Sequence, residues 1–519
     1  MIKNFYKQFY DIERWLFYLI MVTMPIQSLP KRYTIPKFMK NVPQCILIVA
    51  FILCILYFVH NRKSDEIISK WWKIYFSFCI IWPILCTVIG IFVFPYWDMA
   101  TDEYLRNTWL IQQLAKVYPG IVDNTFLLHL KYGQFLVRST ISEFLFPLMG
   151  IPFIFWVAFK KKGNTYILQT VSKMALIVSS ILAVYSLIET AWLLTDNQFL
   201  ADVLKTLYTF IWDPGYDKDH WWPKLLWPGR LRSIYGEPGH FGVMAMFVIP
   251  FLWYRMLELK KRGTGVLLIF FTFMVFMTHS RTALAVFGGE LLILLLLSII
   301  SRYPEWRKYI IHIFVLTLLS FGLYVIVPLG TSYFSARPQS QMQIEKFQSD
   351  MDSIISKNQR SNGARLGNIV AKINVAKQHL LFGVGTNLES RYMIDNIPEF
   401  AKDNWEIKSW SKLAVEELGG GFAALNEFAL VFVEYGLIGL FLYLLPIGYL
   451  FIKVIRYRNV LLINFGIVCI LTSVFGQIAC QLGTGLWLTY PAAMSIAFCV
   501  ISNEMKRPLP DKNATMLKE

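Results

Sequence analysis

Residues 232–254 read RSIYGEPGHFGVMAMFVIPFLWY, and the apolar part of this stretch predicts a membrane helix at residues 235–257. A helix needs about 20 mostly apolar residues to cross the hydrocarbon core of a bilayer. Polar side chains stand at the start of the run, namely Arg232, Glu237 and His240, although lipid disfavours charge there. The stretch therefore predicts a membrane span with a polar group at its mouth.

Similar apolar runs recur along the whole chain, which has 519 residues, of which 56% are hydrophobic and only 16% charged. This composition is typical of a polytopic membrane protein with an all-α fold. We expect about twelve spans, at residues 15–30, 42–60, 74–95, 139–159, 165–195, 235–257, 263–279, 282–301, 309–330, 426–452, 460–480 and 484–502.

Basic residues explain the net charge of +16 without a nucleic-acid partner, because they gather beside every second loop. Lysine and arginine are enriched in the cytoplasmic loops of membrane proteins. Their distribution places both termini in the cytoplasm and the alternate loops outside. The basic loop at residues 29–41, which this pattern places outside, is the exception.

The predicted organisation has four parts. Nine spans occupy residues 1–330, a large outer loop occupies 331–425, three further spans occupy 426–502, and a cytoplasmic tail occupies 503–519. Within the loop, an amphipathic helix is expected at residues 365–381, with Lys372 and Lys377 off its apolar stripe. The apolar stripe comprises Leu366, Ile369, Val370, Ile373, Ala376 and Leu380. The FGVGTN segment at 382–387 then predicts a tight turn.

The first candidate site is the mouth of the span at 235–257. Pro238 suits the first turn of a helix, and Glu237 or Ser233 could cap its amides. Arg230 and Arg232 would add guanidinium groups to a helix N-terminus, which is an environment that binds phosphate. The alternative is a collar of arginine and aromatic side chains at the lipid interface.

The second candidate site is MTHSRTAL, residues 277–284, where two apolar runs meet with almost no loop. Ser280 is expected to cap the next helix, and Arg281 would lie over its first amides. This arrangement again favours an anion. The alternative is a simple interfacial anchor.

Two further groups of polar residues lie in the large loop and at the mouth of the tenth span. The loop contributes Arg360, Arg365, His379 and Arg391, each of which could equally be a solvated charge. The span mouth contributes Asn426 and Glu427, the second of which could serve only the helix dipole. Within the spans, Glu189 and Glu290 either line a polar cavity or hydrogen-bond between helices.

Metal and nucleotide chemistry find no support in the sequence. The seven histidines are scattered, no paired-histidine or Asp-x-Asp motif falls on an outer loop, and nucleotide-binding signatures are absent. We therefore predict no metal and no cofactor. All seven cysteines fall in or at the edges of predicted spans, so no disulfide is expected.

The order of these features resembles the O-antigen polymerase and O-antigen ligase superfamily of bacterial envelope proteins. The resemblance rests on RLRSIYGEPGHFGVMAMFVIP (230–250), MTHSRTALAVFGGELLILLL (277–296), GARLGNIVAKINVAKQHLLFGVGTN (363–387) and NEFALVFVEYGLIGLFLYLLP (426–446).

The resemblance implies a metal-independent glycosyltransferase of the membrane GT-C type. Such an enzyme acts at the outer face of the bacterial inner membrane on donor and acceptor glycans linked to undecaprenyl diphosphate. The implied diphosphate ligands are Arg232 and Arg281, with Arg365 and Arg230 beside them. The other polar residues are assigned to the glycans: Asn426, His379, Arg360 and Arg391. The implied partners are the lipid bilayer and a chain-length regulator protein.

One position departs from the family pattern. Ligase-type members carry a histidine just before the asparagine at the late span mouth, whereas this chain has Leu425 there. Our first choice for the general base is Glu427, followed by His240, Glu237 and His379.

The absent histidine and the GEPGHFG form favour a polymerase over a ligase. A lipid-linked oligosaccharide flippase is the rival from another class, although transporters usually show paired halves and broken spans near the midplane. A peptidoglycan glycosyltransferase of the shape, elongation, division and sporulation group is a further alternative within the enzymes.

Overall fold

The computed structural model describes residues 17–26, 42–60, 70–97, 124–159, 162–211, 229–301, 304–332, 360–416 and 421–505, together with Trp15, Gln113, Lys116 and Val117. Its regular elements in this part of the chain are all helices, so the all-α prediction is confirmed. They are α2 (Val42–His60), α3 (Lys70–Val93), α6 (Asn124–Ser139), the π-helix η3 (Thr140–Gly150), α7 (Ile151–Phe159), α8 (Asn164–Thr195), α9 (Gln198–Ile211), α10 (Pro238–Leu257), α11 (Thr264–Met277), α12 (Arg281–Ser301), α13 (Pro304–Ser332), α15 (Arg360–Gln378), α16 (Glu389–Asp395), α17 (Glu399–Lys402), α18 (Trp405–Glu416), α19 (Glu427–Arg456), α20 (Arg458–Leu461), α21 (Phe465–Cys480) and α22 (Thr489–Met505).

Seven helical segments in the described residues are long and apolar enough to cross a membrane: Lys73–Val93, Tyr132–Phe159, Asn164–Thr195, Pro238–Leu257, Arg281–Ile300, Glu305–Pro328 and Glu427–Arg456. Large apolar side chains such as Phe92, Leu318 and Phe441 are mostly exposed on these helices, as lipid-facing residues would be. Helices α11 and α21 are apolar but shorter. The polytopic membrane class is confirmed, and the count of twelve spans stays a prediction.

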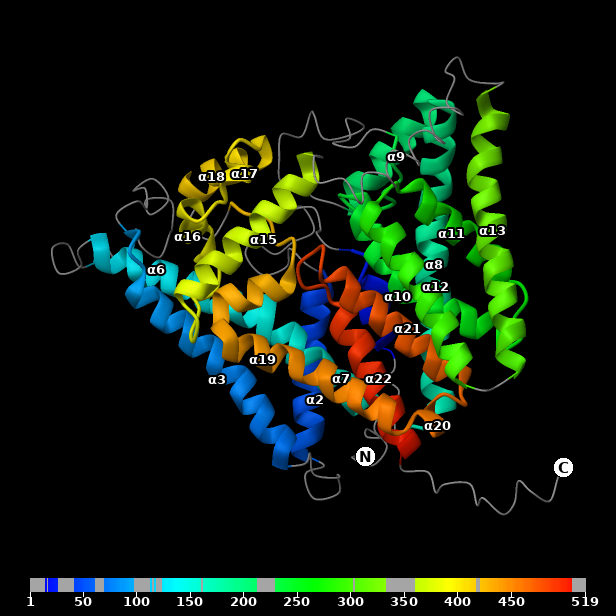
Figure 1. Ribbon diagram of the computed structural model, residues 1–519, viewed down its shortest axis with the longest axis horizontal. Coiled ribbons are helices and arrows are strands. Elements are labelled where there is room, and N and C mark those ends of the chain that lie inside the picture. Colours follow the sequence, from blue (N-terminus) through cyan, green and yellow to red (C-terminus); the bar gives the residue numbers. More distant parts are fainter. Residues whose placement is uncertain are drawn as a thin grey trace.

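Helix α10 forms the centre of the bundle and packs against α8, α11, α12, α21 and α22 (Figure 1). The side chains of Phe247, Phe251 and Trp253 are buried almost completely on it. Its start approaches α12 closely, since a Cβ placed on Gly242 would lie 2.4 Å from Cβ of Ala283. Close packing of the two helices thus brings their N-terminal ends together.

The predicted outer loop contributes the helices α15, α16, α17 and α18, which lie together above α19 in Figure 1. Helix α15 packs directly on α19 and on the three shorter helices. The expected helix in this region is therefore confirmed, although it begins earlier, at Arg360. The loop segment at residues 333–359 lies outside the described residues.

The predicted apolar stripe of α15 is wrong at both of its ends, although Ala376 within it is fully buried. Leu366 and Leu380 are about half exposed, whereas Ala371 and Val375 are fully buried together with the charged Lys372. Small side chains on this face let α15 lie close to its neighbours, as at Gly367, where an added Cβ would lie 2.4 Å from Cβ of Ala401. The helix faces inward with its small residues and a lysine rather than with its largest apolar side chains.

Helix α19 is broken at Gly436, whose φ of 67° and ψ of −168° are not helical. The chain between α15 and α16 lies against this break. The backbone N–H of Leu437 donates to the carbonyl of Leu380 at 2.8 Å, and Val384 N–H donates to Val433 O at 2.9 Å. The Trp82 indole N–H donates to Tyr435 O at 2.9 Å. The break is therefore satisfied by backbone and side-chain hydrogen bonds from elsewhere in the chain.

The FGVGTN segment forms the predicted turn, with positive φ at Gly383 (66°) and Gly385 (88°). Its second role is to fit between two membrane helices. An added Cβ on Gly383 would lie 2.4 Å from the backbone carbon of Glu434, and one on Gly90 of α3 would lie 2.2 Å from Val384 O. Glycine at these positions lets three stretches of backbone touch.

Candidate functional site

The mouths of α10 and α12 lie side by side, as the two sequence motifs suggested. A Cβ on Gly239 would lie 3.7 Å from Oγ of Ser280. The N–H of Leu231, just before α10, donates to the carbonyl of Met277 at the end of α11, at 3.0 Å. Two helix N-termini with positive dipole ends therefore point to one region of the molecule.

Arg232 lies at the mouth of α10 and is only 6% exposed. The carboxylate of Glu189 on α8 accepts the backbone N–H of Arg232 at 3.1 Å and that of Ser233 at 2.6 Å. The guanidinium of Arg232 lies over the ring of Tyr208 on α9, with Cζ 5.0 Å from the ring centroid. Arg232 thus packs inside the protein, which contradicts a collar facing lipid at this position.

Glu189 was predicted either to line a polar cavity or to form structural hydrogen bonds. The structure shows the second role, because its hydrogen bonds fix the turn that carries Arg232. Ser233 has a φ of 57°, an unusual backbone conformation for a residue other than glycine. Two hydrogen bonds to one buried carboxylate hold this conformation. Glu290 lies fully buried against Gly476 of α21.

The predicted caps of α10 are wrong, while its predicted first turn is confirmed. Pro238 is the first helical residue, and Glu237 occupies the cap position without a side-chain hydrogen bond to the helix. Glu237 is exposed. The ring of His240 lies 4.7 Å from the ring of Trp487, and its Nδ1 has no hydrogen-bond partner in the described residues.

Arg281 begins α12 and turns toward the loop domain. Ser280 caps this helix as predicted, since its Oγ accepts the N–H of Ala283 at 3.4 Å. Arg281 Nη1 donates to Oδ1 of Asn362 on α15 at 2.9 Å, and Arg365 Nη1 donates to Oγ1 of Thr282 at 3.3 Å. The two arginines therefore cross between α12 and α15, so Arg281 is held by the loop helix rather than lying over its own first amides.

Asn426 and Glu427 begin α19 near the same region. Asn426 is the N-cap, because its Oδ1 accepts the N–H of Ala429 at 2.9 Å. Glu427 is 3% exposed, and its Oε2 has no hydrogen-bond partner in the described residues. A buried carboxylate oxygen without a hydrogen bond is costly, and it is therefore a candidate for binding a group absent here.

The segment between α21 and α22, residues 481–488, links these three helix mouths. The N–H of Glu427 donates to Gln481 O at 2.9 Å. A Cβ on Gly483 would lie 3.9 Å from Nη1 of Arg365, and one on Gly485 would lie 3.6 Å from Oε2 of Glu427. Most of this segment falls within the predicted last span, 484–502, so its contacts with the helix mouths were not predicted. The signal was the pair of glycines in QLGTGLW, residues 481–487.

A buried charge group beside Glu427 was also missed. Lys372 on α15 is fully buried and faces Glu389 of α16 together with Glu434 and Glu427 of α19. The Lys372 ammonium donates to the carbonyl of Ala423 at 3.2 Å. The helical pattern of 365–381 could not reveal this group, because its partners come from two distant segments.

The remaining predicted residues have other surroundings. Arg230 is half-buried in the turn before Leu231, and the side chain of Arg360 lies outside the described residues. His379 packs against the ring of Tyr392 at 5.0 Å, and burial lowers its pKa. Arg391 donates to the carbonyl of Val415 on α18. His379 and Arg391 therefore contact the outer helices, whereas Thr282, Arg365 and Glu427 lie beside the 481–488 segment.

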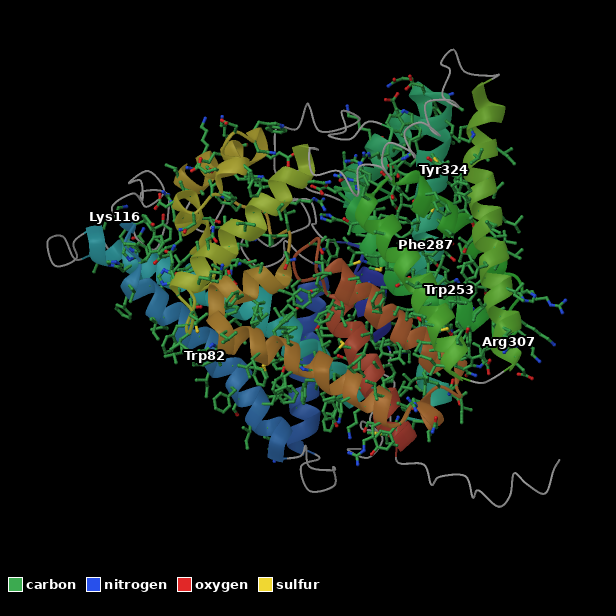
Figure 2. The ribbon with its side chains drawn as sticks, in the orientation of Figure 1. Trp82, Lys116, Trp253, Phe287, Arg307 and Tyr324 are labelled. Atoms are coloured by element: carbon green, nitrogen blue, oxygen red, sulfur yellow. The ribbon has the colours of Figure 1, made fainter. Side chains whose placement is uncertain are left out.

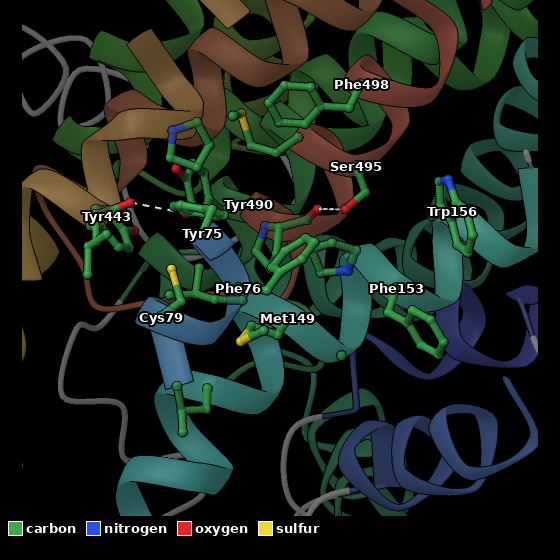
Figure 3. A pocket seen from close by; sticks show the side chains of 18 of the residues that line it. Tyr75, Phe76, Cys79, Met149, Phe153, Trp156, Tyr443, Tyr490, Ser495 and Phe498 are labelled. Atoms are coloured by element: carbon green, nitrogen blue, oxygen red, sulfur yellow. Dashed lines mark hydrogen bonds between the residues drawn. The ribbon is translucent and has the colours of Figure 1, made fainter. Parts of the chain in front are cut away.

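A large apolar cavity of about 760 Å³ lies between α2, α3, η3, α7, α19 and α22 (Figure 3). Its walls include Phe76, Cys79, Phe153, Phe498 and Lys453. Tyr443, also on its wall, donates from its hydroxyl to Oε1 of Gln481 at 2.6 Å. Gln481 therefore connects the cavity wall to Glu427, because its side chain binds Tyr443 and its backbone carbonyl accepts the N–H of Glu427.

Two chemical features define the site. The mouths of α10, α12 and α19 all contact the 481–488 segment. Helix N-termini with arginines nearby, here Arg232, Arg281 and Arg365, attract a polyanion. A buried carboxylate at the third helix could accept a proton. In the described residues, no three histidine, cysteine or acidic side chains are grouped as a metal site.

Comparisons with known proteins agree with this layout. Residues 266–444 match the family model described as O-antigen ligase. The matched region runs from α11 through the loop helices to α19 and contains Arg281, Arg365 and Glu427. No curated protein and no solved structure matches the chain.

Proposed function

We propose, because residues 266–444 match the family model described as O-antigen ligase, that the chain polymerises lipid-linked glycan repeat units into a surface polysaccharide. The observation that carries this proposal is that Arg365, the mouth of α12 and the buried Glu427 all lie beside the 481–488 segment. The substrates are glycans linked to undecaprenyl diphosphate, and the reaction takes place at the outer face of the bacterial inner membrane. Both chain termini then lie in the cytoplasm.

In the proposed reaction, a hydroxyl of the acceptor sugar attacks the anomeric carbon of the donor glycan. The bond between that carbon and the diphosphate oxygen breaks, and undecaprenyl diphosphate leaves with the bonding electrons. Arg281, Arg232 and Arg365 stabilise the negative charge on the leaving group. Glu427 takes the proton of the attacking hydroxyl. Asn426 holds the mouth of α19 in place through its cap, and a chain-length regulator is the proposed protein partner.

The second candidate is a ligase that transfers finished polymer to lipid A core, which the description of the matched family favours. Leu425 supports the polymerase, because ligase-type members have a histidine at that place. Deleting the gene distinguishes the two on a polysaccharide gel. A polymerase deletion leaves single repeat units on the core, whereas a ligase deletion leaves long polymer that is not attached to it.

The first prediction concerns Arg281 in a deletion strain that carries the gene on a plasmid. We expect Arg281→Ala to slow glycan transfer on the order of 100-fold, because one charged donor to the leaving group is lost. Wild-type protein restores long polysaccharide chains on the gel. The control is Arg307→Ala, because Arg307 is exposed on α13 and labelled in Figure 2. Normal polysaccharide with Arg281→Ala at a normal protein level would overturn the diphosphate role.

The apolar cavity is the proposed place for the polyprenyl chain of the donor. The second prediction is that Cys79→Trp, which fills part of the cavity, raises KM for a long polyprenyl donor about tenfold, the equivalent of roughly two lost buried CH₂ contacts. A donor with a short prenyl chain should keep its KM. The control is Leu85→Trp, which changes an exposed residue of α3 outside the cavity wall. Equal effects on both donors would exclude the cavity as the chain site.

A further inference from the structure

Helix α19 is bent back at Gly436, so that its two halves contact each other. Phe428 lies in the first half and Tyr443 in the second. A straight helix would separate these two residues by about 22 Å, at 1.5 Å per residue, which is too far for their side chains to meet. Their rings instead lie nearly at right angles, with centroids 5.7 Å apart. The bend therefore places a residue of the second half beside Phe428, the neighbour of Glu427.

Tyr443 lies between the apolar cavity and Gln481. Its ring is part of the cavity wall, next to the ring of Tyr490 at 5.9 Å (Figure 3). Its hydroxyl donates to Oε1 of Gln481 at 2.6 Å. Both residues are almost completely buried, with 5% of Tyr443 and 1% of Gln481 exposed, so bulk water has little access to this hydrogen bond. One buried hydrogen bond thus joins the cavity wall to the end of α21.

The chain at 481–482 in turn holds the start of α19. The carbonyl of Gln481 accepts the N–H of Glu427 at 2.9 Å, and the carbonyl of Leu482 accepts the side-chain amide of Asn426 at 3.2 Å. Gln481 therefore binds Tyr443 through its side chain and Glu427 through its backbone. A movement of the Tyr443 hydroxyl consequently acts on the residue to which the N–H of Glu427 is bonded.

Aromatic neighbours pack against only part of the Tyr443 ring. Phe144, Phe428 and Tyr490 contact it, with ring centroids 6.3, 5.7 and 5.9 Å away. Another part of the ring borders the cavity of about 760 Å³. A hydrocarbon chain in this cavity would make further dispersion contacts with the ring and would restrict its motion. Binding of such a chain would therefore fix the hydroxyl of Tyr443 on Gln481.

We propose that Tyr443 and Gln481 couple the polyprenyl chain of the donor to the position of Glu427, so that a long chain raises kcat as well as lowering KM. This inference rests on the proposed function, in which the cavity binds the chain and Glu427 is the base. Tyr443 and Gln481 are positioning residues, because they act through Glu427 and do not contact the reacting atoms.

The physical basis is the use of binding energy from a remote part of the substrate. Contacts with a part that does not react can hold catalytic groups in place, and a truncated substrate then loses kcat as well as affinity. A displacement of about 1 Å at the reacting groups can slow a reaction on the order of 100-fold. Loss of one hydrogen bond that reaches the base through Gln481 has a smaller effect, and we expect about tenfold in kcat.

The experiment is the third prediction and measures glycan transfer by purified full-length protein. The same repeat unit is supplied on undecaprenyl diphosphate and on farnesyl diphosphate, which has a much shorter prenyl chain. We expect the wild-type protein to show a kcat about tenfold higher with the long donor. Tyr443→Phe should reduce this kcat to the value for the short donor and leave the short-donor kcat unchanged. KM for the long donor should stay close to wild type, because phenylalanine keeps the ring on the cavity wall.

A second variant tests the other end of the hydrogen bond. Gln481→Leu removes the acceptor and should lower the long-donor kcat as Tyr443→Phe does. The two changes together should cause no further loss, because both remove the same interaction. The matched control is Tyr457→Phe, which changes a tyrosine at the end of the same helix and outside the cavity wall. It should keep the wild-type kcat with both donors.

The outcomes separate this inference from the proposed function. Equal wild-type kcat values for the two donors, or a wild-type kcat for Tyr443→Phe with the long donor, would overturn the coupling while the proposed function stands. Independent losses that multiply in the double variant would also overturn it. If Tyr443→Phe does not fold, the comparison of the two donors and Gln481→Leu still test the coupling. Transfer from neither donor by the wild-type protein would instead overturn the proposed function.

Discussion

Replacing Glu427 with glutamine should reduce glycan transfer roughly 1,000-fold, because the acceptor hydroxyl would lose its general base. Glutamine has almost the same shape, so the cap at Asn426 and the bond from Glu427 N–H to Gln481 O should remain. The protein should therefore fold normally and still bind its donor. The measurement is the rate of transfer at saturating donor, with the amount of membrane-inserted protein determined in parallel.

The control for this fourth prediction is Glu399→Gln. Glu399 begins α17, is highly exposed and pairs with Lys402 at the surface. Its replacement should leave the rate within experimental error of wild type. A Glu427→Gln protein that transfers glycan at the wild-type rate would remove Glu427 from the reaction, and His240 beside Trp487 would become the next candidate.

The sequence predicted those parts of the site that depend on one local segment. Pro238 at the start of α10 and Ser280 as the cap of α12 are both where local helix rules place them. The close approach of these two mouths agrees with the family resemblance, which assigns Arg232 and Arg281 to one diphosphate. What local rules could not supply was the partner of each arginine, because Tyr208 and Asn362 come from separate helices.

Lys372 shows why the loop helix was predicted in the wrong phase. The buried face of a helix is predicted from the positions of its largest apolar residues, and in this segment Leu366 and Leu380 are two of them. In the structure the helix packs with its small residues, and a buried lysine on it interacts electrostatically with three glutamates. Hydrophobic periodicity contains no information about charge partners that lie on other helices.

The break in α19 could not be predicted from the sequence either. A single glycine in an apolar run is common in membrane helices, so Gly436 gave no signal of its own. Its conformation depends on the chain at 380–385, about 50 residues earlier, which donates N–H groups to the carbonyls of Val433 and Glu434. This long-range contact joins the loop helices to the membrane bundle and holds the charge group in place.

The fifth prediction is that Gly436→Ala prevents stable folding. The φ of 67° with ψ near 180° is a region that only glycine enters readily, and strain there alone costs on the order of 1–3 kcal/mol. The new Cβ would also lie 2.1 Å from Leu381 O, so the turn or the helix must move. We expect little membrane-inserted protein and a clearly lowered Tm in detergent.

The matched control for this change lies on the same helix. A Cβ on Gly448 would meet nothing within 4 Å, and alanine is favoured over glycine in a helix by about 1 kcal/mol. Gly448→Ala should therefore leave the Tm unchanged or raise it slightly. If Gly436→Ala instead matched Gly448→Ala in Tm and in activity, α19 would tolerate a regular helix at 436. The contact between the 380–385 chain and the break would then be unnecessary for the position of Glu434 and Glu427.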